Sequence, residues 1–362
     1  ASMNIAIFWT GVTGPMAACW RELAAREGVS LTVFTELPAA PDTAYRHEEL
    51  LAGLTAHVHR GGRPLDRAGL ERQVAAAAPD AMVILGWRSP MCRFAAEHPA
   101  FARVPKWIAF DMTWAPQPRK FLAPFVLRRY LRRFAGAIVP GERSAEYAGW
   151  LGFSASRIER GGMYGVDTAA CAESFVARAA RPEYPRRFLY VGRYVREKRI
   201  DVLVAAYRRY RSLVRDPWDL TCCGMGPDGR LLAGVEGIRD LGFVQPAEMP
   251  RIHAEHAALV LASDYDPWPF VITEAVASGL PIACTSACGN TVELVRSWFN
   301  GRITGPGDVA GLAEALAWLH DRGPDLAWIG ERGMPLAAPY AKEVWADRIL
   351  ALCRRGKVVG CP

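Results

Sequence analysis

The stretch Asp264-Tyr-Asp-Pro-Trp-Pro-Phe-Val-Ile-Thr-Glu-Ala-Val-Ala-Ser-Gly-Leu-Pro281 predicts a loop followed by a short helix. The apolar run at residues 257–262, just before it, is typical of a buried strand. Pro269 fits the first turn of a helix, where its missing N–H costs nothing, and Gly279 followed by Pro281 ends one. We therefore expect a strand, an acidic loop and a helix over residues 270–278.

This unit has the groups that a nucleotide-sugar requires. The first turn of a helix presents backbone N–H groups and the positive end of the helix dipole, which suit a phosphate. Asp266 and Glu274 lie on either side of that turn, and carboxylates accept hydrogen bonds from hydroxyls. A site with phosphate donors beside hydroxyl acceptors is therefore indicated.

Asp266 and Glu274 resemble the E-x7-E signature of retaining glycosyltransferases of family four (glycosyl transferases group 1), with Asp in place of the first Glu. Tyr164-Gly-Val-Asp167 is similar to the family's NGVD segment, with Tyr in place of Asn. Two further segments resemble its GR…EK loop and its NG…PGD tail: Val191-Gly-Arg-Tyr-Val-Arg-Glu-Lys198 and Asn300-Gly…Pro-Gly-Asp308. The matches occur in the family's order between residues 135 and 350, which makes the set specific.

The resemblance implies the GT-B fold, an α/β fold in which two doubly wound, Rossmann-like domains face each other across a cleft at the carboxyl ends of both sheets. Alternating strand and helix patterns in both halves also indicate parallel sheets. The predicted strands are residues 4–8, 30–34, 81–85, 106–110 and 136–139 in the first half, and 187–191, 220–223, 257–261 and 281–284 in the second.

Three regions are expected along the 362 residues, a length that suits two domains. Residues 1–167 form an N-terminal acceptor-binding domain, and residues 168–340 form a nucleotide-sugar-binding domain. Residues 341–362 form a terminal helix that, in the family, crosses back to the first domain. The Ala-, Arg- and Pro-rich stretch 169–185 lacks a strand pattern, and we interpret it as the boundary between the halves.

Composition predicts a globular protein of the cytoplasm, with 51% hydrophobic and 22% charged residues. No apolar run approaches the ~18–20 residues that cross a bilayer. The apolar start at residues 3–9 lacks the basic leader and cleavage site of a signal peptide. Nine Cys, an odd number without scaffold spacing, indicate reduced thiols in a cytosol.

A net charge of +7 and a pI near 9.0 favour anionic partners such as nucleotides or lipid head groups. Nucleic acid is not expected, because no binding module is recognisable. The segment 119–134 has six basic residues and no acid, with Leu127, Tyr130, Leu131 and Phe134 at helical spacing. It is either a basic amphipathic helix in peripheral contact with the anionic inner face of a membrane, or a sheet-covering helix with a solvated basic face.

Arg193 and Lys198 follow the predicted strand 187–191, at the carboxyl end where such sheets bind ligands. Two cations can neutralise a diphosphate as the sugar–oxygen bond breaks. The resemblance implies that both hold the donor diphosphate. A solvated basic loop is the alternative, since Arg196 and Arg199 lie beside them.

The resemblance gives each acid a separate role. The acid at the position of Glu274 takes the ribose hydroxyls, and the acid at the position of Asp266 contacts the donor sugar. Asp is one methylene shorter than Glu, which leaves the sugar open. Pro269 stands where the family usually has Gly; because proline has no N–H, the amides of Phe270 and Val271 are the remaining donors there.

Several glycine loops follow predicted strands. In the family, the loop that here contains Gly11 and Gly14 meets the diphosphate and the transferred sugar; the sequence between them is not a dinucleotide fingerprint. The loop at Gly224 and the segment at Val244 resemble those that meet the base. Plain turns are the alternative for Gly11, Gly14 and Gly224.

Asp111 ends the predicted strand 106–110, near the place where many relatives have a His beside the reacting sugar. It is the candidate to orient the acceptor hydroxyl, and a helix cap or loop acid is the alternative. Asp264-Tyr-Asp266 also fits a D-x-D metal pattern, but two-acid matches are common and Asp266 already has a role. No metal and no cofactor are expected.

By resemblance, the chain is a retaining glycosyltransferase that uses a nucleotide diphosphate sugar, with UDP favoured over GDP. The acceptor would be a bacterial surface glycan or a lipid-linked oligosaccharide. Arg193, Lys198, Asp266 and Asp111 are the catalytic candidates, and a front-face route is expected in which the leaving phosphate takes the acceptor's proton. The alternatives are a small-molecule acceptor, an epimerase or phosphorylase on the same fold, and a non-catalytic nucleotide-sugar-binding protein.

Overall fold

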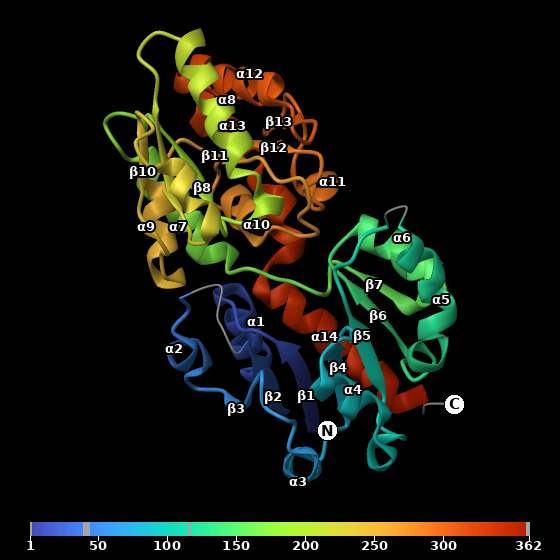
Figure 1. Ribbon diagram of the computed structural model, residues 1–362. Helices are drawn as coiled ribbons and strands as arrows, with labels where there is room; N and C mark the ends of the chain where they lie inside the picture. Colours follow the sequence, from blue (N-terminus) through green and yellow to red (C-terminus); the bar gives the residue numbers. More distant parts are fainter. Residues whose placement is uncertain (1, 39–43, 115–116, 360–362) are drawn as a thin grey trace. The chain divides into compact units, whose positions relative to one another are not determined.

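The computed structural model describes residues 2–38, 44–114 and 117–359, which form two compact units (Figure 1). The first consists of residues 2–38, Tyr45–Val166 and the segment from Tyr340 onward; the second consists mainly of Asp167–Pro339. Within the described ranges, no helix combines the length and the apolar character needed to cross a bilayer.

The first unit is built on a seven-stranded parallel sheet in the order β3-β2-β1-β4-β5-β6-β7. Its strands are β1 (Met3–Thr10), β2 (Val29–Leu37), β3 (Thr55–Arg60), β4 (Ala81–Leu85), β5 (Lys106–Ala109), β6 (Gly136–Val139) and β7 (Ile158–Arg160). Its helices are α1 (Gly14–Ala24), α2 (His47–Leu51), α3 (Arg67–Ala77), α4 (Pro90–Glu97), α5 (Pro118–Leu131), α6 (Glu142–Trp150) and α14 (Lys342–Val359). All five strands expected here from the sequence are present.

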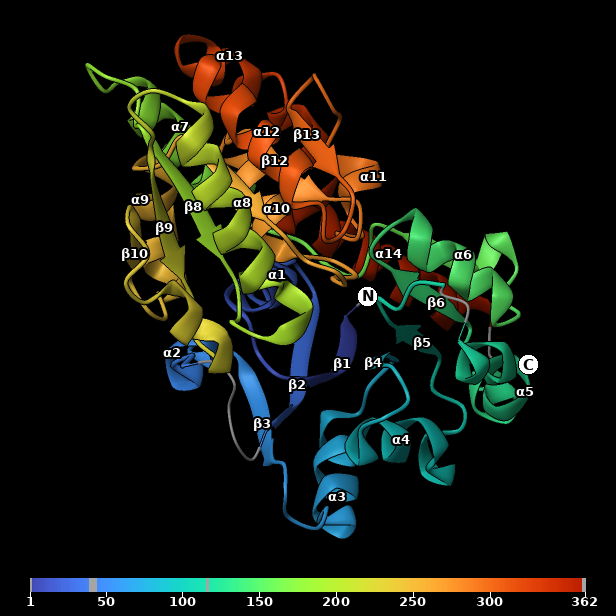
Figure 2. The ribbon, with the colours of Figure 1, turned by 45° about the horizontal axis from the view of Figure 1, so that its top comes forward.

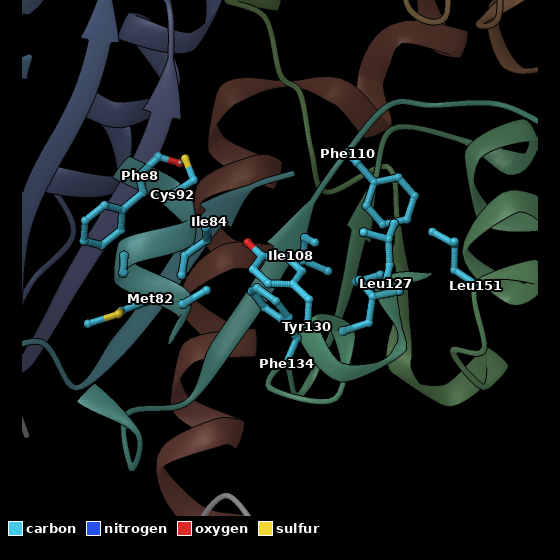
Figure 3. Packing of buried hydrophobic residues seen from close by; sticks show 14 of the residues in the cluster. Phe8, Met82, Ile84, Cys92, Ile108, Phe110, Leu127, Tyr130, Phe134 and Leu151 are labelled. Carbon is cyan, nitrogen blue, oxygen red and sulfur yellow. Dashed lines mark hydrogen bonds between the residues drawn. The ribbon is translucent and has the colours of Figure 1, made fainter. Parts of the chain in front are cut away.

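The core of this unit lies where α4 and α5 cover the sheet (Figure 3). Apolar side chains of the central strands, such as Ile84 and Ile108, meet Leu127 and Tyr130 of α5. Leu131 and Phe134 are buried in the same cluster. The predicted stripe at 127–134 is therefore a sheet-covering stripe.

The terminal helix α14 packs on α1 and β4 of the first unit. Trp345 of α14 donates from its ring nitrogen to the Met163 carbonyl at 3.2 Å, and Arg348 donates to the Gly161 carbonyl at 2.8 Å. These bonds hold α14 to the end of the first unit's chain, just before the second unit begins.

The second unit has a six-stranded parallel sheet in the order β10-β9-β8-β11-β12-β13. Its strands are β8 (Arg187–Val191), β9 (Asp219–Cys223), β10 (Ile238–Asp240), β11 (Ala258–Leu261), β12 (Ile282–Thr285) and β13 (Gly301–Thr304). Its helices are α7 (Thr168–Ala179), α8 (Ile200–Leu213), α9 (Met249–Ala254), α10 (Phe270–Ala277), α11 (Thr291–Leu294), α12 (Val309–Asp321) and α13 (Leu326–Glu331). Helix α8 packs against α12, and α7 packs against α9 and α10 (Figure 2).

The interpretation of residues 169–185 as a boundary is wrong, because most of this stretch is helix α7. Its alanines favour a helix, and Asp167 caps it by accepting from the Ala170 amide at 3.1 Å. Arg178 of α7 is fully buried and donates to the carbonyls of Ser278 and Gly279 at 2.5 and 2.6 Å. A basic residue of the stretch that was interpreted as the boundary therefore ties α7 to the second unit.

Candidate functional site

The topology of the second unit brings two predicted site loops together. Strand β8 lies between β9 and β11, so the connections that leave the carboxyl ends of β8 and β11 run in opposite directions across the sheet. In open parallel sheets this is the place where ligands bind. The Asp264 amide donates to the Glu197 carbonyl at 2.9 Å, which joins the loop after β11 to the loop after β8.

Lys198 and Asp266 form an ion pair between these two loops. Their side chains are only 14% and 12% exposed. Burial raises the pKa of the Asp266 carboxyl, and the Lys198 ammonium opposes that rise. The Asp266 carbonyl also accepts from the Gly289 amide at 2.7 Å, so the acid is fixed by its backbone as well as by its partner.

The basic residues of this loop do not share one environment. The carbonyl of Arg193 accepts a hydrogen bond from the buried Tyr190 hydroxyl at 3.1 Å, while its guanidinium lies 3.7 Å from the Glu197 carboxylate. Arg199 is held at the start of α8 by the carboxylates of Asp201 and Asp264. Arg199 is therefore committed to fixing the loop, whereas Lys198 is paired with Asp266 and Arg193 lies beside Glu197.

Glu274 lies one turn into α10 and differs from Asp266 in having no counter-charge. In the part of the chain that the structure describes, no cation pairs with its carboxylate. Burial raises the pKa of Glu274 to about 7. A carboxylate in such a place is well suited to accept hydrogen bonds from hydroxyl groups, which would supply the polar contacts that the protein does not.

The first turn of α10 is organised by Asn290, which the sequence analysis missed. Asn290 is fully buried and donates to the Pro269 carbonyl at 2.9 Å. The first turn of α10 contains no acid. The signal in the sequence was a Gly-Asn pair shortly after the strand 281–284, at the carboxyl edge of the sheet.

Gly224 and Val244 lie in neighbouring loops after β9 and β10. A Cβ on Gly224 would lie 1.9 Å from the Gly192 carbonyl oxygen, so only glycine lets the loops after β8 and β9 approach this closely. The Gly224 amide donates to the Gly242 carbonyl at 2.8 Å, which brings the segment with Val244 alongside. The close packing of the two loops thus requires glycine at position 224, independently of any ligand.

Gly14 and Asp111 belong to the first unit. Gly14 begins α1 behind the cap residue Thr13, whose side chain accepts from the Met16 amide at 3.4 Å. Asp111 follows β5, and its carboxylate accepts from the Tyr164 hydroxyl at 2.9 Å. Tyr164, which stands where the family has Asn, is therefore the partner of Asp111, the acid near the position of the family's His.

The second unit is similar to proteins of a known family. Residues 185–322 match the family model described as glycosyl transferases group 1. The glycogen synthase of Mycobacterium tuberculosis is 33% identical over 164 residues, which is 43% of this chain and 38% of that protein. The lipopolysaccharide 1,6-galactosyltransferase of Escherichia coli is 29% identical over 140 residues, or 36% of this chain and 38% of that protein. The chain thus spans 38% of the length of each of these relatives.

Solved structures resemble the whole chain. The Anabaena protein HepE in complex with UDP and glucose matches with a TM-score of 0.73 and 17% identity, covering 98% of this chain and 99% of that one. Sucrose-phosphate synthase from Thermosynechococcus elongatus matches with a TM-score of 0.72 and 17% identity, covering 97% and 98%. At these identities the likeness shows the fold alone. It confirms the predicted GT-B fold with two Rossmann-like parallel sheets.

Proposed function

We propose that this protein is a retaining glycosyltransferase that moves a sugar from a nucleotide diphosphate sugar, UDP-linked in preference to GDP-linked, to a hydroxyl acceptor. One observation carries the proposal. At the carboxyl edge of the second sheet, a hydrogen bond joins the loop after β8, which has Arg193 and Lys198, to the loop after β11. The latter leads into α10, whose first turn has no acid and whose Glu274 carboxylate has no counter-charge among the described residues. The group 1 domain at residues 185–322 and the UDP bound in the HepE structures support it.

The donor would be held by groups of opposite kinds. Arg193 and Lys198, with the amides of Phe270 and Val271, would take the diphosphate, because guanidinium, ammonium and helix-start N–H groups all favour anions. Glu274 would accept from the ribose hydroxyls. Asp266 has a second carboxylate oxygen beyond the one bound by Lys198, and it would accept from a hydroxyl of the sugar.

The chemistry then depends on stabilising the leaving group. As the bond from the anomeric carbon to the phosphate oxygen breaks, the transition state gains oxocarbenium character and the diphosphate gains charge. Arg193 and Lys198 would stabilise that charge more in the transition state than in the ground state. The acceptor oxygen would bond to the anomeric carbon from the same face, and its proton would pass to the departing phosphate oxygen.

Asp111 would orient the acceptor hydroxyl, with Tyr164 holding its carboxylate. We include no metal in this scheme, because Asp264 and Asp266, the two acids of the D-x-D pattern, are each paired with a cation of the protein. No cofactor beyond the donor substrate is required for the transfer.

A glycan or lipid-linked acceptor is the preferred choice. Two relatives are named a lipopolysaccharide galactosyltransferase and an exopolysaccharide phosphotransferase, the latter from Streptomyces coelicolor and 29% identical over 176 residues. All eight cysteines in the described ranges are buried as thiols, which suits a reaction in the reducing cytoplasm. Such a protein would act free in the cytoplasm or at the inner face of the membrane.

The test is release of nucleoside diphosphate from UDP-, GDP-, ADP- and TDP-sugars, with and without a glycolipid extract. Arg193→Ala and Glu274→Ala should each abolish release, while Arg196→Ala, an exposed arginine of the same loop, should not. Product anomeric configuration, measured by NMR coupling constants, tests retention. If the protein binds a donor but releases no nucleoside diphosphate under any condition, it is a non-catalytic binding protein and the proposal is wrong.

A further inference from the structure

Helix α5 is apolar on two opposite sides. The side with Leu127 and Tyr130 is buried against the sheet (Figure 3), and Leu131 is buried in the same cluster. A second set of large apolar side chains faces solvent, and we call it the exposed α5 face. It consists of Phe121, Leu122, Phe125 and Val126, which are 45%, 59%, 78% and 76% exposed.

Helical geometry makes these four residues one patch. Residues four apart lie above one another on a helix, so Phe121 lies beside Phe125 and Leu122 beside Val126. A contiguous apolar patch costs solubility and, on a folded protein, marks a surface that meets a partner. The sheet-covering role of α5 accounts for its buried side and leaves this patch unexplained.

Aromatic rings border the exposed α5 face. Trp150 of α6 is 46% exposed. Its ring centroid lies 4.8 Å from that of Trp114 and 6.0 Å from that of Phe121. The Trp150 ring nitrogen donates to the Lys120 carbonyl at 3.2 Å. Half-exposed tryptophans of this kind suit the boundary between lipid and water, where the ring is apolar and its N–H is satisfied.

Arginines border the same face at its carboxyl-terminal end. Exposed arginines occupy the last turn of α5 and its C-cap: Arg128, Arg129 and Arg132. A groove of about 460 Å³ beside Phe125 is lined by Arg128, Arg132 and Arg157, and none of its lining residues in the described part of the chain is acidic. Guanidinium groups beside an apolar surface favour an amphiphilic ligand, which has an anionic group next to an apolar part.

We propose that the exposed α5 face docks on an anionic membrane surface. Phe121, Leu122, Phe125 and Val126 enter the head-group region, and the arginines beside them pair with lipid phosphates. The basic segment is uninterrupted, since the sequence has no acid between Asp111 and Glu142. Pairing of two copies through this face would bring like charges together, which disfavours a self-complementary contact.

Vesicle binding tests this docking without any sugar donor, so its outcome is separate from that of the transfer reaction. The full chain is centrifuged with phosphatidylcholine vesicles, with and without phosphatidylglycerol. We expect binding to the vesicles that contain phosphatidylglycerol, weakened by added salt. Val126→Asp should lower the partition coefficient by about tenfold or more, because an apolar contact with the membrane is lost and a negative charge is placed beside the negatively charged lipids.

Two matched controls sharpen the test. Val176→Asp makes the same change at another exposed helical valine, 65% exposed on α7 of the second unit, and should bind as the parent does. Each arginine near an anionic surface contributes about fivefold, so Arg128→Gln with Arg129→Gln should lower binding about 25-fold. Arg208→Gln with Arg209→Gln removes the same charge from an exposed pair on α8 and should have a much smaller effect.

Three outcomes overturn the proposal. One is no binding to either kind of vesicle. Another is an equal loss in the α5 variants and in their matched controls, which would mean that only net charge matters. The third is self-association of the parent chain that Val126→Asp abolishes in sedimentation, which would make the face an interface between copies. If Val126→Asp melts early, the arginine pair alone decides, because Arg128 and Arg129 are exposed and outside the core.

Discussion

Replacing Glu274 with glutamine should stabilise the folded protein and, at the same time, weaken its binding of the donor. The pKa of Glu274 is raised from 4.5 to about 7 because the carboxyl is buried without a cation. One pKa unit corresponds to about 1.36 kcal/mol, so the charged form destabilises the second unit by up to about 3 kcal/mol. Glutamine keeps the shape of the side chain and removes the charge.

The pH dependence follows from the direction of this shift. Below pH 4.5 the acid is neutral in both the folded and the unfolded chain, so parent and variant should be equally stable. Between pH 4.5 and about 7 the unfolded chain releases its proton first, so the stability of the parent falls as the pH rises. Above that window the variant should be the more stable by up to about 3 kcal/mol.

Urea unfolding at pH 4.5 and at pH 8, followed by fluorescence, measures this difference. Donor binding should show the opposite trend, because the ionised carboxylate is the better acceptor for hydroxyls. The affinity for UDP should therefore rise more steeply through pH 7 in the parent than in Glu274→Gln, where only the phosphate of UDP itself titrates. Glu248→Gln, which changes an exposed acid of the same unit, controls for loss of one charge. The reasoning is refuted if Glu274→Gln changes stability equally at both pH values.

Further predictions concern the loops and the first unit. Lys198→Ala should destabilise the second unit by about 3 kcal/mol in urea unfolding, because it leaves Asp266 buried without its cation, and Asp266→Asn in the same chain should recover part of that loss. Gly224→Ala should cost about 1–3 kcal/mol by thermal melting, since its Cβ would overlap a carbonyl oxygen. Tyr164→Phe should lower acceptor-dependent transfer by about tenfold through loss of one hydrogen bond to Asp111, with UDP affinity unchanged in calorimetry.

The sequence was most informative about the centre of each sheet. Central strands such as β4 and β8 are apolar, buried on both sides and bounded by clear turn signals, so their limits were predicted to the residue. The strands that were missed lie at sheet edges or are only three or four residues long. Strand β3, Thr55-Ala-His-Val-His-Arg60, is polar because an edge is partly solvated, and β7, β10 and β13 are too short for a period to show.

The position of the candidate site residues in the fold was predictable to the extent that it depends on local sequence pattern. Arg193, Lys198 and Asp266 follow strands, and topology alone brings their loops to one edge. Tertiary contacts such as those of Asn290 and Tyr164 left no periodic signal, because they depend on which loops meet in space. The same reason explains α5: its sequence shows that both sides are apolar, but only packing decides which side the sheet covers.

The three departures from the family's pattern share one property, since each has a partner in the structure that restores a polar contact. Asp266, one methylene shorter than Glu, is bound by Lys198. Pro269 cannot donate, and its carbonyl is held by Asn290. Tyr164 is longer than Asn and reaches Asp111.

By resemblance, the departures fall at positions that meet the donor sugar or, through Tyr164, the acceptor, whereas Glu274, assigned to the ribose, follows the pattern. A buried carboxylate or amide without a partner costs stability. If the protein had lost its activity, we would expect such polar groups to be replaced by apolar ones rather than kept in pairs. Paired substitutions of this kind are better explained by a changed sugar or acceptor on a retained nucleotide site. We therefore expect UDP binding to survive exchange of Asp266→Glu, while the preference among UDP-sugars changes; an unchanged preference in competition assays would show that the length of this side chain does not select the sugar.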